Sequence, residues 1–306
     1  MAGPVTRHPA FGLMLAAFGA LVLTPDAMLL RLSGMNGPQM LGWRGIFMGT
    51  SLIVIWALTS RARRADLALL TSGAGVAIAC CQFFNSSLFA LGIAAAPVAI
   101  VLFGIATTPI WAALFAWALL GERTANATWI TIAVVALGIG IAVLGGGEAS
   151  ATPGAVVFGA VAGLGVAMML AMNFVVLRSR PALPIPLLIG VGALCAGAAG
   201  VMVTGPAQMT DGNVWAIAIT GCIILPVSFL SLSFASRYTA ASNVSLLLLL
   251  ETVLGPAWVW LVLDEALTPP MVLGGGIVVG AIALYLLHAR RKGRRRYAKT
   301  TNLAAK

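Results

Sequence analysis

Ten long apolar runs dominate this sequence, and they restrict the fold more than any other feature. Each is bounded by glycine, proline or charged residues, and each is close to the roughly 20 residues that an α-helix needs to cross a bilayer. The runs predict a polytopic membrane protein with ten transmembrane helices. They cover residues 11–30, 40–58, 67–91, 97–120, 128–145, 154–177, 183–204, 213–235, 241–263 and 271–288.

The composition excludes the main alternatives to this fold class. Only 8% of the 306 residues are charged and 60% are hydrophobic, whereas about a quarter of a soluble protein is charged. The same apolar content excludes a disordered or collagen-like chain. A membrane β-barrel needs alternating polar and apolar residues, and the leucines at 246–250 do not alternate. Because lipid leaves only helices and closed barrels as spanning structures, we expect an all-α protein.

Lysine and arginine placement predicts the orientation. With a cytoplasmic N-terminus, every basic residue except Arg31 and Arg44 falls in an inside segment, as the positive-inside rule requires. Most of the net charge of +10 lies in the tail after His288, which is typical of an anchor at the membrane surface rather than of a nucleic-acid site. We therefore expect both termini in the cytoplasm and a location in a bacterial inner membrane.

The two halves of the chain show signs of an internal repeat. With an offset of 147 residues, Phe11-Gly12 aligns with Phe158-Gly159 and Leu30-Arg31 with Leu177-Arg178; with an offset of 143, Glu122 aligns with Glu265. A repeat of five helices, an odd number, enters the membrane in the opposite direction the second time. We expect inverted repeats at 1–147 and 148–289, a basic tail at 290–306, and a binding site between the halves. The repeat also predicts that run 11–30 is a retained helix rather than a signal peptide.

Two sets of residues predict local features of the helices. Three pairs of glycines with GxxxG spacing, Gly45–Gly49, Gly159–Gly163 and Gly276–Gly280, favour close helix packing in lipid. Prolines are expected to interrupt four helices, because proline removes one backbone hydrogen bond. These are Pro25, Pro109, Pro226 and Pro256.

Motifs for other functions are missing from the sequence. The four cysteines lie in apolar runs without a CxxC, so we expect neither a disulfide framework nor a metal site. His8 and His288 stand at the ends of spans, and no HExxH or GxSxG occurs, so we expect no enzyme and no cofactor. No filter-like loop points to a channel, although a channel or a non-transporting membrane protein stays an alternative.

The chain resembles the drug/metabolite transporter superfamily in its EamA-type ten-helix branch, over residues 11–288. The resemblance rests on the start of the second helix and on the fourth and ninth helices. The matching residues are Leu41-Gly42-Trp43-Arg44, Thr108-Pro109-Ile110-Trp111, Leu120-Gly121-Glu122-Arg123, Leu249-Leu250-Glu251-Thr252 and Leu263-Asp264-Glu265.

The sequence departs from the family pattern at a few positions. Thr252 stands where a proline is usual, Asp264 replaces a glycine, and Phe18-Gly19 stands where Trp-Gly is common. Within the branch, the chain is most similar to the YddG-type exporters of aromatic amino acids. The resemblance implies export of amino acids or related amphipathic compounds.

Three charged residues inside the spans are the first candidates for a site, because a charge at the bilayer centre costs about 2.5–3.5 kcal/mol without a partner or cavity. Asp26 follows Pro25 and could contact a ligand or lie at the outer interface. Arg44 could bind a substrate carboxylate, snorkel outward, or pair with Asp26 or Glu251. Glu251 could bind a proton or a substrate amine, or could make a structural hydrogen bond.

Uncharged polar and aromatic residues complete the candidate site. Gln82 and Asn85 share one helix face, and so do Thr107 and Trp111. Each of these residues could line a cavity or simply bond to a neighbouring helix. Three further candidates are Asn173, Asn243 and Trp258.

These observations predict a secondary transporter of small amphipathic metabolites that works by alternating access. One acid, one base, several amides and aromatic rings suit amino acids, most of all aromatic ones. The alternative is a carrier of drugs, cations or other metabolites. We expect the lipid bilayer and a small-molecule substrate as partners, with possible proton coupling, no nucleic acid, and a monomer because the pseudo-symmetric interface is internal.

Overall fold

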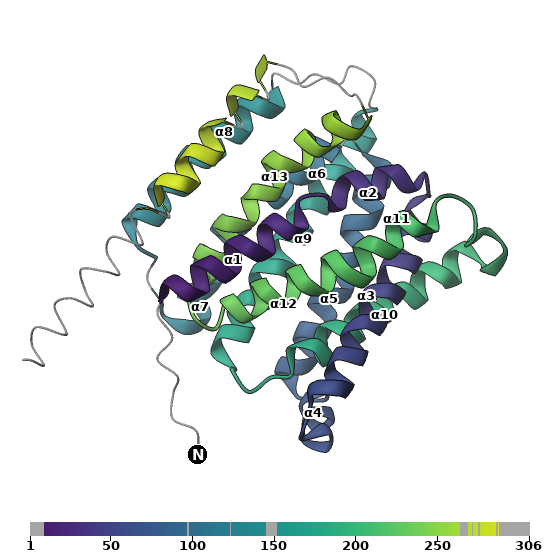
Figure 1. The fold of residues 1–306 in the computed structure, drawn as a ribbon. Helices are drawn as coiled ribbons and strands as arrows, with labels where there is room; N and C mark the ends of the chain where they lie inside the picture. Colours follow the sequence, from purple (N-terminus) through teal and green to yellow (C-terminus); the bar gives the residue numbers. More distant parts are fainter. Residues whose placement is uncertain are drawn as a thin grey trace, which may run out of the picture.

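The computed structural model describes residues 9–96, 98–122, 124–144, 152–263, 269–270, 272–274, 276–285 and 287. Every regular element in these ranges is a helix (Figure 1). The first half contains α1 (Pro9–Leu23), α2 (Asp26–Ser33), α3 (Gly37–Thr59), α4 (Arg63–Leu70), α5 (Gly73–Ala95), α6 (Val98–Ile105), α7 (Thr108–Leu120) and α8 (Asn126–Leu144). The second contains α9 (Pro153–Ser179), α10 (Ile185–Thr204), η1 (Pro206–Gln208), α11 (Val214–Ile219), η2 (Thr220–Ile224), α12 (Leu225–Ala235) and α13 (Ala241–Leu263).

Among the described residues, seven helices are long and apolar enough to cross a membrane. They run over Phe11–Ser33, Gly37–Thr59, Gly73–Ala95, Val157–Ser179, Ile185–Thr204, Val214–Ala235 and Ala241–Val262. Shorter apolar helices cover Thr108–Leu120, Asn126–Gly138 and Val272–Tyr285. The prediction of an all-α polytopic membrane protein is therefore confirmed. Each of the seven long helices and of the three shorter ones overlaps a different one of the ten predicted runs.

The first span is broken where threonine precedes proline. Pro25 has no N–H for the carbonyl of Leu21, so α1 ends at Leu23 and α2 begins at Asp26. The Thr24 hydroxyl donates to this freed carbonyl at 2.8 Å. The freed carbonyl of Leu21 thus keeps a partner, and the first residue of α2 lies inside the bundle.

The same arrangement recurs between α6 and α7. Pro109 leaves the carbonyl of Ile105 without its helical donor, α6 ends at Ile105, and the hydroxyl of Thr108 donates to that carbonyl. Two of the four expected interruptions are therefore full breaks. Pro226 instead follows the π-helical turn η2, which continues into α12. The expectation for Pro256 is wrong, because α13 runs through position 256 as one helix.

Glycines set the closest helix contacts. A Cβ at Gly45 would lie 2.4 Å from the nitrogen of Gly197, so α3 and α10 touch backbone to backbone. A Cβ at Gly163 would lie 2.3 Å from the carbonyl oxygen of Val101, which brings α9 equally close to α6. Two of the three GxxxG predictions are thus confirmed. Gly276 and Gly280 have no atom within 4 Å of their Cβ positions, so the third prediction finds no contact within the described chain.

The core of the bundle is formed by a few helix pairs, and α8 stands at its edge. α3 packs on α10, α5 on α9, α7 on both α9 and α13, and α1 on both α12 and α13. The helix over Val272–Tyr285, yellow in Figure 1, runs beside α8. Gly138 on α8 faces the carbonyl of Gly274, which joins these two outer helices. The predicted site residues lie on the inner helices.

Candidate functional site

A buried ion pair lies at the break in the first span. Nη1 of Arg44 on α3 is 2.7 Å from Oδ2 of Asp26, the first residue of α2. The side chain of Asp26 is fully buried and that of Arg44 is 7% exposed. Asp26 therefore does not lie at the outer interface, and Arg44 does not snorkel outward. Of the alternatives that the sequence left open, the structure shows the pair of Arg44 with Asp26.

An aromatic ring completes the environment of the guanidinium. Cζ of Arg44 lies 4.6 Å from the centre of the Phe89 ring on α5, a distance at which the ring face attracts a cation. Arg44 is thus held by an acid on one side and a ring on another. This position leaves little of its charge free for a substrate carboxylate.

Glu251 on α13 is the second acid of this centre. It is buried, and it lies close enough to Asp26 and Arg44 to interact with both charges. Two carboxylates thus lie near one guanidinium in a part of the protein surrounded by apolar helices. With both acids ionised, the centre carries one unbalanced negative charge, and one proton or one ligand cation neutralises it.

Trp258 ties α13 to the break in the first span. Its indole N–H donates to the Thr24 hydroxyl at 2.9 Å, while that hydroxyl donates to Leu21. Trp258 follows Glu251 by seven residues, two helical turns, so both side chains lie on the α13 face that meets the broken helix. Trp258 is also 37% exposed, which gives its ring an open side.

Gln82 lies in a polar layer next to the ion pair. Its Nε2 donates to Ser86 at 2.9 Å and lies 3.8 Å from the sulfur of Met48, which is one turn from Arg44 on α3. Its Oε1 has no hydrogen-bond partner in the described part of the chain. Asn85 is buried on the same helix, as expected from the shared face. A buried acceptor without a donor is costly unless a ligand or water supplies one.

Thr107 and Trp111 meet at the break between α6 and α7. The indole N–H of Trp111 donates to the Thr107 hydroxyl at 3.2 Å, which confirms the predicted shared face. Both α6 and α7 pack on α13, and Leu102 lies against Gly255, one turn from Glu251. The break in this span thus lies beside the same α13 segment as the break in the first span.

The two remaining asparagines occupy different places. Asn173 on α9 is buried, and its Oδ1 has no partner among the described residues. Asn243 is not part of the charged centre: it donates to the Thr239 hydroxyl at 3.0 Å and accepts from Tyr285 at 2.5 Å. It belongs to a separate network at one end of the bundle.

Sequence reasoning missed several members of the centre. Phe89 resembles any other phenylalanine of an apolar span, and Ser86 resembles any other small residue of a packed helix. Thr24 carried a usable signal, because a hydroxyl directly before a proline can satisfy the carbonyl that the proline frees. The matching Thr108-Pro109 shows the same signal in the fourth run.

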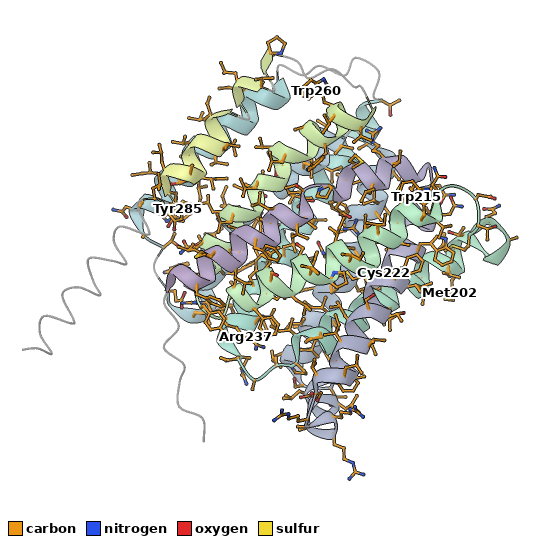
Figure 2. All side chains as sticks on the ribbon, in the orientation of Figure 1. Met202, Trp215, Cys222, Arg237, Trp260 and Tyr285 are labelled. Atoms are coloured by element: carbon orange, nitrogen blue, oxygen red, sulfur yellow. The ribbon has the colours of Figure 1, made fainter. Side chains whose placement is uncertain are left out.

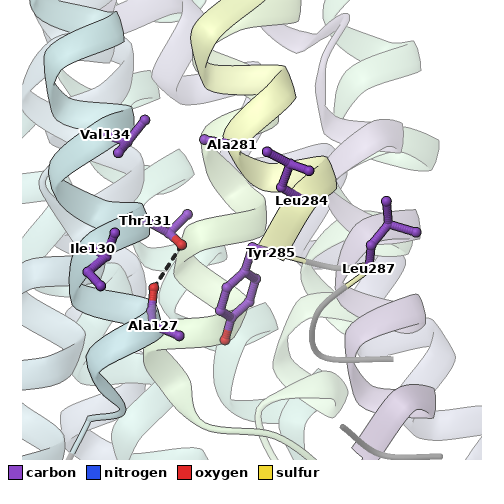
Figure 3. Close-up of a pocket in the computed structure, with 8 residues that line it drawn as sticks. All are labelled: Ala127, Ile130, Thr131, Val134, Ala281, Leu284, Tyr285 and Leu287. Carbon is purple, nitrogen blue, oxygen red and sulfur yellow. Dashed lines mark hydrogen bonds between the residues drawn. The ribbon is translucent and has the colours of Figure 1, made fainter. Parts of the chain in front are cut away.

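A pocket of about 530 Å³ lies away from this centre, between α8 and the helix over Val272–Tyr285 (Figure 3). Most of its lining is aliphatic. The Thr131 hydroxyl donates to the carbonyl of Ala127 at 2.8 Å, and the Tyr285 hydroxyl donates to Asn243. Because these polar groups are already bonded, the pocket offers little to a charged solute. Among the described residues, no group of His, Cys, Asp and Glu side chains could hold a metal ion.

Comparison with known proteins adds information on the fold alone. No family model and no curated protein matches the sequence. A crystal structure of a protein with no further description has a TM-score of 0.71 to this chain, over 92% of this chain and 97% of the other, at 18% identity. The chain therefore has a fold that a solved structure shares over nearly its whole length.

Proposed function

We propose that this chain is a secondary transporter of small amphipathic metabolites. The observation that carries the proposal is the pair of Asp26 and Arg44 with Glu251 beside it, buried among apolar helices. Charged groups at this depth are costly, and in membrane proteins they mark substrate or ion pathways. Two of the helices that meet there, the first and fourth spans, are broken at its level. Broken spans beside a polar centre are typical of transporters.

The packing pattern supports an inverted repeat of five helices in each half. Exchanging the first five expected helices with the last five maps the pair α5–α9 onto α12–α1, and the pair α7–α9 onto α13–α1. The pairs α3–α10 and α7–α13 map onto themselves. All of these pairs are in contact. This pattern favours ten spans divided at residues 147 and 148, with the centre between the halves.

The same features favour the drug/metabolite transporter superfamily and its EamA-type branch. The buried Arg44, the Thr108-Pro109 break and Glu251 all fall in the segments that carry the resemblance. On this proposal the protein lies in a bacterial inner membrane with both termini in the cytoplasm, works as a monomer and uses no cofactor. Alternating access, rather than a chemical reaction, is its activity.

Aromatic amino acids are the first candidate substrates. Among the described residues Glu251 forms no ion pair, so it is the group to receive a substrate ammonium. The rings of Trp111 and Trp258 lie on helices that flank it and could pack against an aromatic side chain.

Organic cations are the second candidates, and one observation favours them. Arg44 is already engaged by Asp26 and Phe89, so a substrate carboxylate has to compete for it. An amine without a carboxylate avoids this competition and still neutralises the centre.

A competition assay separates these two classes. Proteoliposomes with the purified chain are loaded with labelled phenylalanine or with labelled phenethylamine, and efflux is measured with unlabelled phenylalanine or phenethylamine present. Saturable flux inhibited by phenylalanine supports amino-acid transport. Flux inhibited more strongly by phenethylamine supports a cation carrier. Absence of flux for both labelled compounds, with folded protein, contradicts the proposed substrate class.

A further inference from the structure

A second polar network closes one end of the bundle, and Arg178 is its centre. Nε of Arg178, in the last turn of α9, lies 2.8 and 3.0 Å from the two carboxylate oxygens of Glu122. Its Nη1 donates to the carbonyls of Thr239 at 2.7 Å and Ser236 at 3.4 Å. One side chain thus joins the end of α7, the end of α9 and the turn between α12 and α13.

Local structure places Glu122 for this contact. Gly121 ends α7 with φ of 65°, a left-handed conformation that glycine adopts without strain. The chain then turns back, and the Glu122 N–H donates to the carbonyl of Ala116 at 3.2 Å. The carboxylate is thereby held next to the end of α9. Arg178 is placed by a helix that continues unbroken from Pro153.

The network extends to the outer pair of helices. Asn243 donates to the Thr239 hydroxyl and accepts from Tyr285, and the Tyr285 hydroxyl lies 3.3 Å from that of Thr128 on α8. A chain of polar contacts therefore runs from Glu122 to Thr128. Figure 2 places Tyr285 and Arg237 toward this end of the bundle, with Trp215 and Trp260 toward the other.

The exposure of this ion pair differs sharply from that of the central one. The side chains of Arg178 and Glu122 are 25% and 36% exposed, whereas those of Arg44 and Asp26 are almost completely buried. Opening a buried pair leaves unpaired charges in an apolar interior. Opening a partly exposed pair lets water replace the lost contacts at little cost. Of the two pairs, the Glu122–Arg178 pair is the one that can break and re-form in each cycle.

We propose that the contacts of Arg178 with Glu122, Ser236 and Thr239 form a latch that holds this end of the bundle shut. The latch joins the first half of the chain, through Glu122, to the second half, through Arg178 and the α12–α13 turn. Separation of the halves at this end therefore requires that it open. The inference rests on the proposed function, which places this end in the cytoplasm and requires it to open in alternating access.

The test measures how readily water-borne reagents reach the interior from this end. Val244 is a suitable reporter, because it is fully buried and precedes Glu251 by seven residues on the same α13 face. The four native cysteines are replaced by alanine and Val244→Cys is introduced. The rate of labelling by a hydrophilic maleimide is then measured in detergent for the intact latch and for Glu122→Gln and Arg178→Gln.

The latch predicts that both variants raise the labelling rate severalfold over the reporter background. Arg180→Gln is the matched control, because Arg180 is exposed at the same helix end and takes no part in the latch. It should leave the rate unchanged. The reversed pair Glu122→Arg with Arg178→Glu should recover only part of the increase, because it restores the ion pair but a glutamate at 178 cannot donate to the two carbonyls.

Equal labelling rates in the intact protein, Glu122→Gln and Arg178→Gln would overturn the latch, and so would an equal increase in Arg180→Gln. If Arg178→Gln does not fold, the labelling rate of Glu122→Gln is the test. This variant is expected to fold because it leaves both carbonyl contacts of Arg178 in place. No substrate enters this assay. If the variants raise the labelling rate but the purified chain transports no substrate, the latch stands and only the proposed function is contradicted.

Discussion

At the scale of single residues, the charged centre combines a closed pair with an open acid. Asp26 and Arg44 form an ion pair at 2.7 Å, and Arg44 lies over the Phe89 ring. Glu251 interacts with both charges but forms no ion pair of its own in the described part of the chain. The pair has a structural role, because it fixes the start of α2 against α3. Glu251 is the group left to respond to a proton or ligand.

Removing one partner of the buried pair should destabilise the fold more than removing both. Arg44→Gln leaves the Asp26 carboxylate without its cation and beside a second buried acid, and we expect a loss of about 3–5 kcal/mol. Asp26→Asn combined with Arg44→Gln leaves no such charge and should recover much of that loss. Thermal unfolding of the two single variants and the double variant in detergent measures this coupling. Additive losses would show that the two side chains do not stabilise each other.

The sequence identified the charged members of this centre but not their arrangement. Asp26, Arg44 and Glu251 could be selected because charges are rare in apolar spans. Which acid pairs with Arg44 depends on the packing of α2, α3 and α13, and no sequence pattern reports that packing. For the same reason, Asn243 was grouped with the centre although it bonds to Tyr285 at one end of the bundle.

At the scale of elements, Thr-Pro pairs explain how spans break without losing hydrogen bonds. Thr24 is the clearer case, since its hydroxyl donates to Leu21 and accepts from the Trp258 indole. Thr24→Val keeps the shape but leaves the Trp258 indole N–H without its acceptor and the Leu21 carbonyl with only the longer backbone bond from residue 24, at an expected cost of about 1–3 kcal/mol. Thr24→Ser keeps the hydroxyl and should stay close to the native stability. Equal unfolding temperatures for the two variants would contradict this role.

Close packing of α3 on α10 depends on residues without a Cβ. Gly45→Ala would bring a Cβ to 2.4 Å from the backbone of Gly197, where no flexible side chain can move aside. We expect a loss of about 1–3 kcal/mol through overpacking. Gly140→Ala on α8 is the matched control, because no atom lies within 4 Å of its Cβ position. Thermal unfolding of both variants tests the contact, and a Gly45→Ala protein as stable as the control would refute it.

The sequence predicted the spans better than their interruptions. Apolar length marks a span because the bilayer sets that length, and each of the long helices overlaps a predicted run to within a few residues at its C-terminal end. Whether a proline breaks a helix depends on its neighbours. Pro25 and Pro109 each follow a threonine that satisfies the freed carbonyl, and Pro226 follows a π-turn, but α13 continues through position 256.

At the scale of the whole molecule, the proposed orientation makes opposite ends of the bundle accessible from opposite sides. Thr71 ends the exposed α4 segment, which we place in the cytoplasm, and Asp211 lies in the exposed turn after η1, which we place outside. With native cysteines replaced, Asp211→Cys should react with an impermeant maleimide in intact spheroplasts. Thr71→Cys should react only after lysis. The reverse result would invert the topology and place the latch on the outer side.

The inverted repeat could be proposed from sequence because a few residues align at offsets of 147 and 143. The main packing pairs agree with this proposal, since α5–α9 and α7–α9 have their counterparts in α12–α1 and α13–α1 under exchange of the halves. The latch could not be predicted, because Glu122, Arg178 and Thr239 are separated along the chain and meet only through the packing of α7, α9 and α13. Only their place at span ends was visible.

Uptake of labelled phenylalanine into proteoliposomes, with and without an imposed pH gradient, tests the central claim most directly. The native chain is compared with Glu251→Gln and with Asp211→Asn, which removes an exposed carboxylate far from the centre. We predict saturable uptake in the native chain and in Asp211→Asn, and accumulation of phenylalanine when the pH gradient is imposed. In Glu251→Gln, the pH gradient should no longer cause accumulation. The same accumulation in Glu251→Gln, or no flux above empty liposomes for folded native protein, would contradict the account.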